Sequence, residues 1–284
     1  MATLEAADGF RIVKPSAVSG DWRRTVYLAV TLALTELKVR FFDSALGYLW
    51  SLMRPLMFFG VLYLVFNQII RAGDTIDFYP VVLLMGIVLY TFVAEATGDS
   101  VESMIKHESL IRRVAFPRLV IPLAVTVTAV FNLLMNLIVV FVFIALAGVE
   151  IRWTWLELPV LLALLMALSL GIALLLSVLY VRFRDIKPIW QVVLQATFYA
   201  TPILYPVEVV RQHYPGAVHY VMCNPLAAIN QQIRYAVLDP TAPSAGQAIG
   251  GVGRLAVPLA IIVVMFVAGL VCFVRMAPTI AEEL

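Results

Sequence analysis

Residues 102–122 read ESMIKHESLIRRVAFPRLVIP, and this short basic segment separates two long apolar runs of the chain. Its helical pattern of apolar positions is interrupted at Pro117, because proline does not continue a helix. A polar segment between two membrane spans has to face water on one side of the bilayer. The segment therefore predicts a loop, with a membrane span on each side of it. Its four cationic residues are Lys106, Arg112, Arg113 and Arg118.

The composition of the 284 residues is that of a membrane protein. Hydrophobic residues make up 62% of the chain and charged residues 13%, and the mean hydropathy is +0.96. A soluble domain of this length does not bury so much apolar sequence. The net charge of +2 is small and the cations are not gathered into one patch, so nothing points to nucleic acid. We therefore expect an all-α membrane protein with several spans.

Hydropathy predicts a six-span domain over residues 46–275, because a helix needs roughly 20 apolar residues to cross a bilayer. The expected spans are residues 46–70, 78–94, 119–146, 155–180, 189–205 and 255–274. Residues 22–42 contain an uncharged run of only about half that length. They predict an amphipathic helix in the membrane interface, with a buried hairpin helix as the alternative. Residues 1–21 are expected to form a cytosolic lead without a cleaved signal peptide, and residues 276–284 a cytosolic tail.

Residues 207–254, between the fifth and sixth expected spans, alternate apolar and polar residues at helical spacing but are too polar to span. They predict two short re-entrant helices, split near Asn224 and Pro225, that dip into the outer leaflet. Non-helical backbone at membrane depth has to be covered by protein or water, and this split would place such backbone between the two helices.

The distribution of cations predicts the topology. With the amino terminus in the cytosol, 15 of the 20 lysines and arginines lie on the cytosolic side, in agreement with the positive-inside rule. Both termini are then cytosolic, and so is the basic segment 102–122. A second basic loop over residues 181–188 lies on the same side.

Polar residues in or near the spans leave alternatives open. Glu95, Asp99 and Glu102 share one helical face, which suits either a proton relay or the water-exposed end of a span. Asn132 and Asn136, one turn apart, suit interhelical hydrogen bonds or a ligand site. The chain has no phosphate-binding loop, HExxH pair or GxSxG turn, and its two cysteines and three histidines form no ligand cluster. We therefore predict no catalytic site and no metal site.

Five sequence landmarks carry a resemblance to a known family. In chain order they are KVRFFDSALGYLWSLMRPL (residues 38–56), ESLIRRVAFPRLVIP (108–122), YVRFRDI (180–186), TPILYP (201–206) and CNPLAAINQQIR (223–234). Each landmark alone is weak, whereas five in this order are specific. Together they resemble the permeases of type-2 ABC transporters that export polysaccharide, O-antigen or teichoic acid.

The resemblance implies a homodimer of permeases that works with two copies of a separate nucleotide-binding ATPase. ATP and Mg would bind to that ATPase, and no cofactor to this chain. Residues 102–117 would contain the first contact with the ATPase, and residues 182–187 the second. The implied coupling residues are Lys106, His107, Glu108, Ser109, Leu110, Arg112, Arg113, Phe116 and Pro117 in the first contact, and Arg182, Arg184, Asp185 and Lys187 in the second.

The resemblance also implies a channel with an outer gate. Aromatic side chains facing the channel would stack on sugar rings; the candidates are Tyr63, Phe66, Tyr90, Phe92, Phe198, Tyr199 and Tyr205. The outer gate would include Pro206, Asn224, Pro225 and Arg234. A cationic cluster near the cytosolic mouth would attract an anionic lipid headgroup. Its members are Arg23, Arg24, Lys38 and Arg40.

The implied function is export of a polyprenyl-linked polysaccharide, such as O-antigen or galactan, or of a teichoic-acid-like polymer across the plasma (inner) membrane. One alternative with the same fold is export of drugs or small lipids. An alternative from another class is a proton-coupled secondary transporter that uses Glu95 and Asp99. A bound ATPase and a requirement for ATP distinguish the exporters from the proton-coupled carrier.

Overall fold

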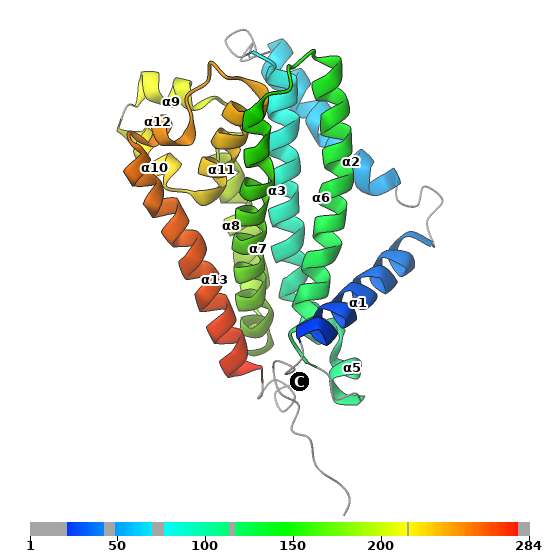
Figure 1. Cartoon of the computed structure of the whole chain (residues 1–284). Coiled ribbons are helices and arrows are strands. Elements are labelled where there is room, and N and C mark those ends of the chain that lie inside the picture. The colour runs from blue at the N-terminus through cyan, green and yellow to red at the C-terminus, as the bar shows by residue number, and fades with distance from the viewer. Residues whose placement is uncertain (1–21, 43–48, 70–76, 114–116, 215, 278–284) are drawn as a thin grey trace, which may run out of the picture.

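The computed structural model describes residues 22–42, 49–69, 77–113, 117–214 and 216–277. In these residues the backbone forms helices and turns, and no strand is present. The expected all-α class is therefore confirmed for the described part of the chain. The long helices lie side by side, as Figure 1 shows, with a group of short helices at one end of the bundle.

Five helices among the described residues are long and apolar enough to cross a membrane. They correspond to the first, second, third, fourth and sixth expected spans. They are α2 (Leu49–Tyr63, continued by the π-helix η1, Leu64–Ile69), α3 (Tyr79–Val101), α6 (Val120–Leu146), α7 (Glu157–Arg182, preceded by the 3-10 helix η3, Trp153–Leu156) and α13 (Ala256–Met276, preceded by η5, Val252–Leu255).

The fifth expected span differs from the prediction. Its residues form α8 (Ile186–Ala200), which has 15 residues. At 1.5 Å per residue, α8 rises about 22 Å, less than the roughly 30 Å of a hydrocarbon core. The helix ends two residues before Pro202, and a turn follows as far as Pro206, since proline interrupts helical hydrogen bonding. By length, the described residues thus contain five of the six expected spans.

Helix α3 is the centre of the bundle and α2 lies at its outside. In the most apolar part of α3, 67% of the residues are buried, compared with 11% for α2. The helix packs against α2, α6, α7 and α8, and Leu83, Ile87 and Phe92 are among its fully buried side chains. It also continues to Val101, so that Glu95 and Asp99 lie within the helix rather than beyond a span ending near residue 94.

Two glycines bring α7 and α13 into backbone contact. A Cβ atom at Gly171 would lie 2.5 Å from the Cα atom of Phe266, and one at Gly269 would collide with the carbonyl oxygen of Gly171. Small residues at such a crossing allow two spanning helices to approach closely. From the crossing, α13 leans away from α7 toward the short helices (Figure 1).

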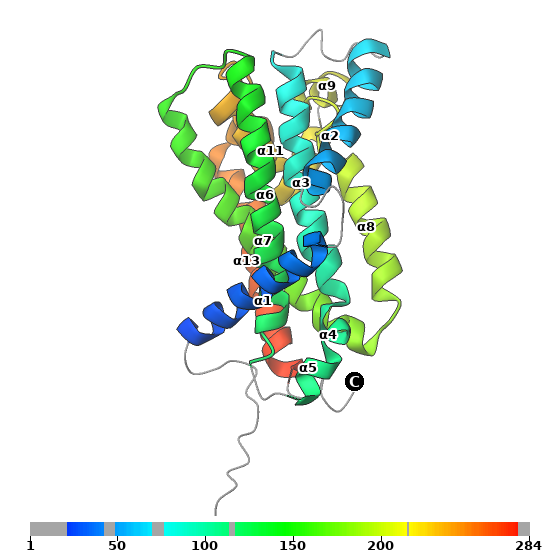
Figure 2. The ribbon, with the colours of Figure 1, turned by 90° about the vertical axis from the view of Figure 1, so that its right-hand side faces the viewer.

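The residues expected to form the interfacial helix are helical and form α1, which runs from Trp22 to Phe42. Its buried residues Thr25, Ala29, Ala33 and Leu37 recur every fourth position and form one face. The helix packs on α6 and crosses it obliquely, as Figure 2 shows. Small side chains on the buried face allow this close packing.

The region between α8 and α13 folds into more short helices than the two expected. They are α9 (Val207–His213), α10 (Ala217–Met222), α11 (Pro225–Ile233), η4 (Arg234–Leu238) and α12 (Ala245–Ile249). The expected break near Asn224 is present: its side chain accepts a hydrogen bond from the backbone N–H of Leu226, 3.0 Å long, and Pro225 occupies the first helical position. The short helices share a small apolar core that includes Val207 and Met222.

We name the two ends of the bundle after the elements that they carry. The short-helix end carries α9 to α12. The basic end carries α4 (Ser103–Lys106), α5 (Glu108–Arg113) and the turn between α7 and α8, residues 183–185.

Candidate functional site

The two basic segments meet at the carboxylate of Glu102, the residue that follows α3. Lys187, in the first turn of α8, places its Nζ atom 2.5 Å from Oε1 of Glu102. The Nζ atom of Lys106, one turn further along the chain, lies 3.5 Å from Oε2. The hydroxyl of Tyr180, near the end of α7, donates a 3.3 Å hydrogen bond to Oε1. One carboxylate therefore links α3, α4, α7 and α8 at the basic end.

The ion pair between Glu102 and Lys187 shifts the pKa of both groups so that the charged forms are favoured. The hydrogen bond from Lys187 lowers the pKa of Glu102; burial opposes this effect, and the charges of Lys187 and Lys106 add to it. In turn, the hydrogen bond to Glu102 raises the pKa of Lys187. Both groups are partly exposed, so the pair fixes geometry more than it adds stability.

A second ion pair connects α1 to His107, the residue that directly follows α4. The Nε2 atom of His107 lies 2.9 Å from Oε1 of Glu36, and its Nδ1 atom lies 2.9 Å from the backbone carbonyl oxygen of Ser103. Both acceptors are oxygens, so the imidazolium form, which has two donors, satisfies both contacts. The hydrogen bond to Glu36 raises the pKa of His107, and burial opposes it. The Glu102–Lys187 pair and the His107–Glu36 pair therefore connect α8 and α1 to the same short segment, residues 102–107, which contains α4.

The structure places the predicted coupling residues on or near the surface of the basic end. Lys106 and Ser109 are exposed; His107, Glu108 and Leu110 are half-buried; Pro117 is buried. In the second segment Arg182, Arg184 and Asp185 are exposed and Lys187 is half-buried. The guanidinium of Arg184 lies 5.3 Å from the ring centroid of Tyr180, a cation–π distance. Phe116 and the side chains of Arg112 and Arg113 lie outside the described residues.

Sequence reasoning missed the roles of two carboxylates in this site. Glu102 was grouped with Glu95 and Asp99 on one helical face, although Lys106 four residues later is the spacing of a helical ion pair. Glu36 is 71 positions from His107, so no local pattern connects them. The cluster depends on the tertiary packing of α1 and α4 against α6.

Two asparagines inside the bundle donate hydrogen bonds through their side-chain amides. The side-chain amide of Asn132 in α6 donates to Oε2 of Glu95 in α3, at 3.0 Å, which is the interhelical contact that the sequence suggested. Asn136 instead donates to the carbonyl oxygen of Asn132 within its own helix, at 2.8 Å. A cavity of about 430 Å³ between α2 and α3 has Arg54, Glu95 and Asp99 among its lining residues.

The aromatic channel candidates fall into buried and exposed groups. Phe92 and Phe198 are buried, with 2% and 6% of their surface exposed, and the Tyr90 ring packs on Phe198 at 4.8 Å. Tyr199 is 59% exposed, and its carbonyl oxygen accepts a 2.9 Å hydrogen bond from the hydroxyl of Tyr205. Tyr63 and Phe66 are half-buried. Of the seven candidates, Tyr199 has the freest ring surface.

Helix α8 presents a polar face to the outside of the chain. Gln191, Gln195 and Tyr199 follow one another every fourth residue, so they share one side of the helix, and all three are exposed. The buried side of the helix holds Phe198, and Trp190 donates through Nε1 to the hydroxyl oxygen of Thr97 in α3 at 3.0 Å. This bond fixes the rotation of α8 against the bundle.

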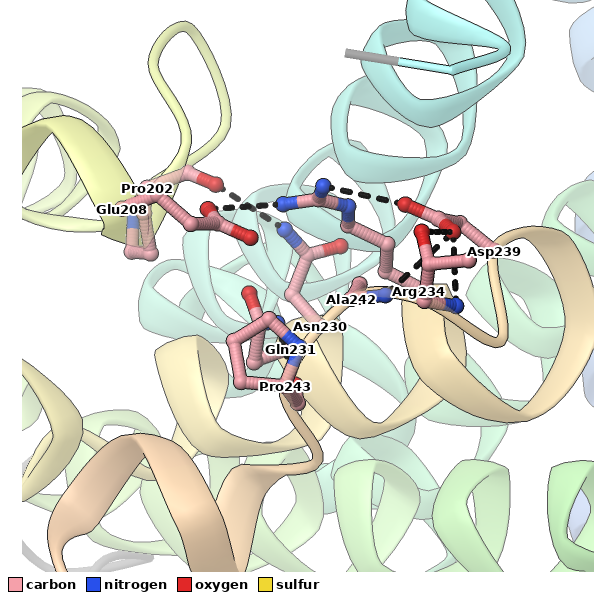
Figure 3. A network of polar contacts seen from close by, with 9 residues as sticks. Pro202, Glu208, Asn230, Gln231, Arg234, Asp239, Ala242 and Pro243 are labelled. Carbon is pink, nitrogen blue, oxygen red and sulfur yellow. Dashed lines mark hydrogen bonds and ion pairs between the residues drawn. The ribbon is translucent and has the colours of Figure 1, made fainter.

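At the short-helix end, Arg234 is the centre of a polar network (Figure 3). Its guanidinium lies 3.1 Å from Oε2 of Glu208 in α9 and 3.2 Å from Oδ2 of Asp239 beyond η4. Asn224 donates to the hydroxyl oxygen of Thr201 at 3.1 Å. The predicted gate residues therefore tie the short helices to one another and to the turn after α8. Pro206, also predicted, is the N-cap residue of α9.

The predicted headgroup residues lie on α1. Arg23, Arg24 and Lys38 have exposed side chains, while the side chain of Arg40 lies outside the described residues. Among the residues that the structure describes, no group of three or more His, Cys, Asp or Glu side chains is placed to hold a metal ion.

The apolar spanning helices and the ion-paired elements at both ends of the bundle define an integral membrane protein. Residues 27–238 match the ABC-2 type transporter family, which is most of the chain, and the chain belongs to this family. The five landmarks lie inside the matched region. Family membership makes the chain a transport subunit rather than an enzyme, and it implies a nucleotide-binding ATPase as partner.

Curated relatives agree with the family. The chain is 30% identical over 203 residues to the O-antigen export system permease protein RfbA of Klebsiella pneumoniae, covering 71% of this chain and 76% of that protein. It is 25% identical over 202 residues to the protein of the same name from Myxococcus xanthus, with the same coverage. The predicted resemblance to polysaccharide-exporting permeases is thus confirmed.

Proposed function

We propose that this chain is the membrane subunit of an ATP-driven exporter that moves a lipid-linked polysaccharide of the O-antigen type, or a teichoic-acid-like polymer, across the plasma (inner) membrane. The observation that carries the proposal is the family match together with relatives named as O-antigen export permeases. Export of drugs or small lipids and proton-coupled transport have no comparable support.

The proposed assembly contains two copies of this chain and two copies of the ATPase. Two helices of the bundle leave broad surfaces uncovered by the rest of the chain. α2 exposes Met57 and Val61, and α8 exposes Val192 and Tyr199. Both helices pack on α3, and Phe58 and Phe198 bring their rings to 5.6 Å, so the two surfaces are neighbours. A second copy placed against them would enclose a channel between the polar faces of the two α8 helices.

The proposed orientation follows the positive-inside rule, with the basic end and both termini in the cytosol. Nucleotide-driven closure of the ATPase would push on α4 and α5. The Glu102–Lys187 pair would pass that displacement to α8, and the His107–Glu36 pair would pass it to α1. α8 and the turn that follows it would complete a sixth crossing, with ATP and Mg bound on the partner.

The channel wall, the outer gate and the headgroup site complete the proposal. Exposed Gln191, Gln195 and Tyr199 on α8 would face the sliding glycan, since amides bond hydroxyl groups and aromatic rings stack on sugars. The short helices would form a re-entrant outer gate. α1 would lie in the cytosolic interface, where Arg24 and Lys38 are placed to attract the anionic headgroup of the lipid-linked substrate.

Deleting the gene in the producing bacterium tests the proposal. Surface polymer should be lost while lipid-linked polymer accumulates on the cytosolic face, and detection with a polymer-binding lectin before and after permeabilisation distinguishes the two pools. A copy of the gene should restore surface polymer, and an ATPase subunit should co-purify with the tagged chain. Unchanged surface polymer in the deletion strain would refute the proposal.

A further inference from the structure

A groove of about 400 Å³ opens between α7 and α13 on the short-helix side of their glycine crossing. α7 contributes Leu161 and Leu164 to one wall, and α13 contributes Leu259 and Ile262 to the other. The volume lies within the range of about 300–1,000 Å³ that small ligands occupy in proteins. The divergence of two spanning helices creates this space, and the crossing closes it at the other end.

The groove is lined by residues within the two spanning helices α7 and α13, a few turns from their starts. Leu161 and Leu164 are four and seven residues into α7, about 6 and 10 Å along the helix axis from its start. Ile262 is six residues into α13, about 9 Å from its start. The neighbouring surfaces of both helices are apolar and exposed, with Val160 61% and Val263 59% exposed. The mouth of the groove therefore faces the bilayer rather than water.

The far wall of the groove is formed by the short helices. Ala228 of α11 and Ala245 and Gly246 of α12 leave room because their side chains are small. Gln232, a polar residue of this wall, is already engaged in hydrogen bonds. Gln232 donates to Glu157 at 2.7 Å and accepts from the backbone N–H of Ala245 at 3.0 Å. The wall thus offers an apolar surface, on which a hydrocarbon chain is more favourable than water.

A cation lies beside the groove in the short helix η5. Val252 and Leu255 of η5 line the groove, and Arg254 between them is exposed. The guanidinium of Arg254 lies 3.3 Å from the carbonyl oxygen of Ile249, the last residue of α12. A single contact of this kind leaves most of the five guanidinium N–H donors available to a phosphate.

We propose that this groove is a phospholipid-binding site in the leaflet at the short-helix end, with one acyl chain between α7 and α13 and the phosphate on Arg254. The occupant contacts spanning helices on one side and α11 and α12 on the other. A bound lipid is then part of the structure that holds the short helices in place. The site is separate from the α2 and α8 surfaces that we assign to the glycan and to the second copy.

Photo-crosslinking tests the site. The purified chain is reconstituted in vesicles of phosphatidylethanolamine and phosphatidylglycerol that contain a phosphatidylethanolamine analogue with a mid-chain diazirine. Labelled peptides are mapped by mass spectrometry. Wild-type protein should concentrate label on the groove segments 225–235 and 244–262. L259W, which fills the mouth, should abolish this excess, whereas V263W, one turn away on the same exposed face, should leave it unchanged.

A second pair of variants tests the contact between Arg254 and the phosphate. R254Q should reduce groove label about fivefold, since a cation near the membrane surface contributes that order of affinity. R152Q changes another arginine at the same end and should have no effect. Thermal unfolding of each variant without added lipid checks that the fold is intact. Equal label on the groove and on the rest of α13, or groove label that survives L259W in a folded protein, would overturn the proposal.

Discussion

Replacing Asp239 should loosen the short-helix end selectively. Oδ1 of Asp239 accepts hydrogen bonds from the backbone N–H of Thr241 at 2.9 Å, from its hydroxyl at 2.6 Å and from the backbone N–H of Ala242 at 3.2 Å. Oδ2 pairs with Arg234 at 3.2 Å. Burial alone would raise the pKa of Asp239, but the Thr241 hydrogen bonds and the charge of Arg234 outweigh it and hold the pKa below its usual range.

The side chains of Asp239 and Arg234 are 4% and 8% exposed. Removing Asp239 costs about 3–5 kcal/mol, because Arg234 loses one of its two carboxylate partners and the three donors that Oδ1 satisfies lose their acceptor. We therefore expect D239A to lower the local stability of the short helices by about this amount. D239N keeps an oxygen acceptor for Thr241 but loses the charge, so we expect a smaller cost of about 1–3 kcal/mol.

Hydrogen exchange measured by mass spectrometry in nanodiscs reports this local stability. A loss of about 3 kcal/mol corresponds to roughly 100-fold faster exchange of amides in α11 and α12. The control is E150A, which removes an exposed carboxylate in the loop between α6 and α7 and should change nothing. Exchange of α11 and α12 that rises less than about threefold in D239A would refute the reasoning, because the order of several kcal/mol follows directly from burial of the pair.

Three further predictions concern other parts of the bundle. Since Glu36 raises the pKa of His107, the contribution of this pair is fully present below about pH 6.5 and is lost as pH rises through the raised pKa. The α1 amides should therefore gain exchange beyond the intrinsic pH effect as pH rises above about 6.5, and a H107Q variant that keeps the same dependence would contradict this. G269L should prevent α13 from seating on α7, with loss of monodisperse protein in size-exclusion chromatography, whereas G60L, at an open position, should be tolerated. Charge reversal at both Arg112 and Arg113 should uncouple ATP hydrolysis from export while the protein stays folded; a normal export rate would make the segment only a connecting loop.

Helix positions were predictable wherever one local property decided them. The apolar runs predicted five of the spanning helices because hydrophobic length alone identifies a helix that crosses a bilayer. The break at Asn224 and Pro225 was predictable because the capping chemistry is local. The end of α8 at Ala200 was not predicted, since the expected span continued through Pro202 to residue 205.

The contacts of the site depend on long-range packing, which a single sequence does not encode in any readable pattern. Glu36 and His107, or Asn132 and Glu95, meet only because their helices cross. Phe92 shows the same limit for a residue that was a candidate for the channel wall. An aromatic residue in a span suits a channel wall or a core equally by composition, and packing against its neighbours leaves it 2% exposed.

We propose that the Glu102–Lys187 pair transmits movement between the ATPase contact and α8. The most direct test measures polymer exported per ATP hydrolysed by the complete transporter in vesicles, for E102K, K187E and the double variant with both charges exchanged. We predict a lowered ratio in each single variant and a partial recovery in the double variant, because the exchanged pair restores attraction. Single variants that export at the wild-type ratio, or a double variant no better than either single one, would contradict the claim.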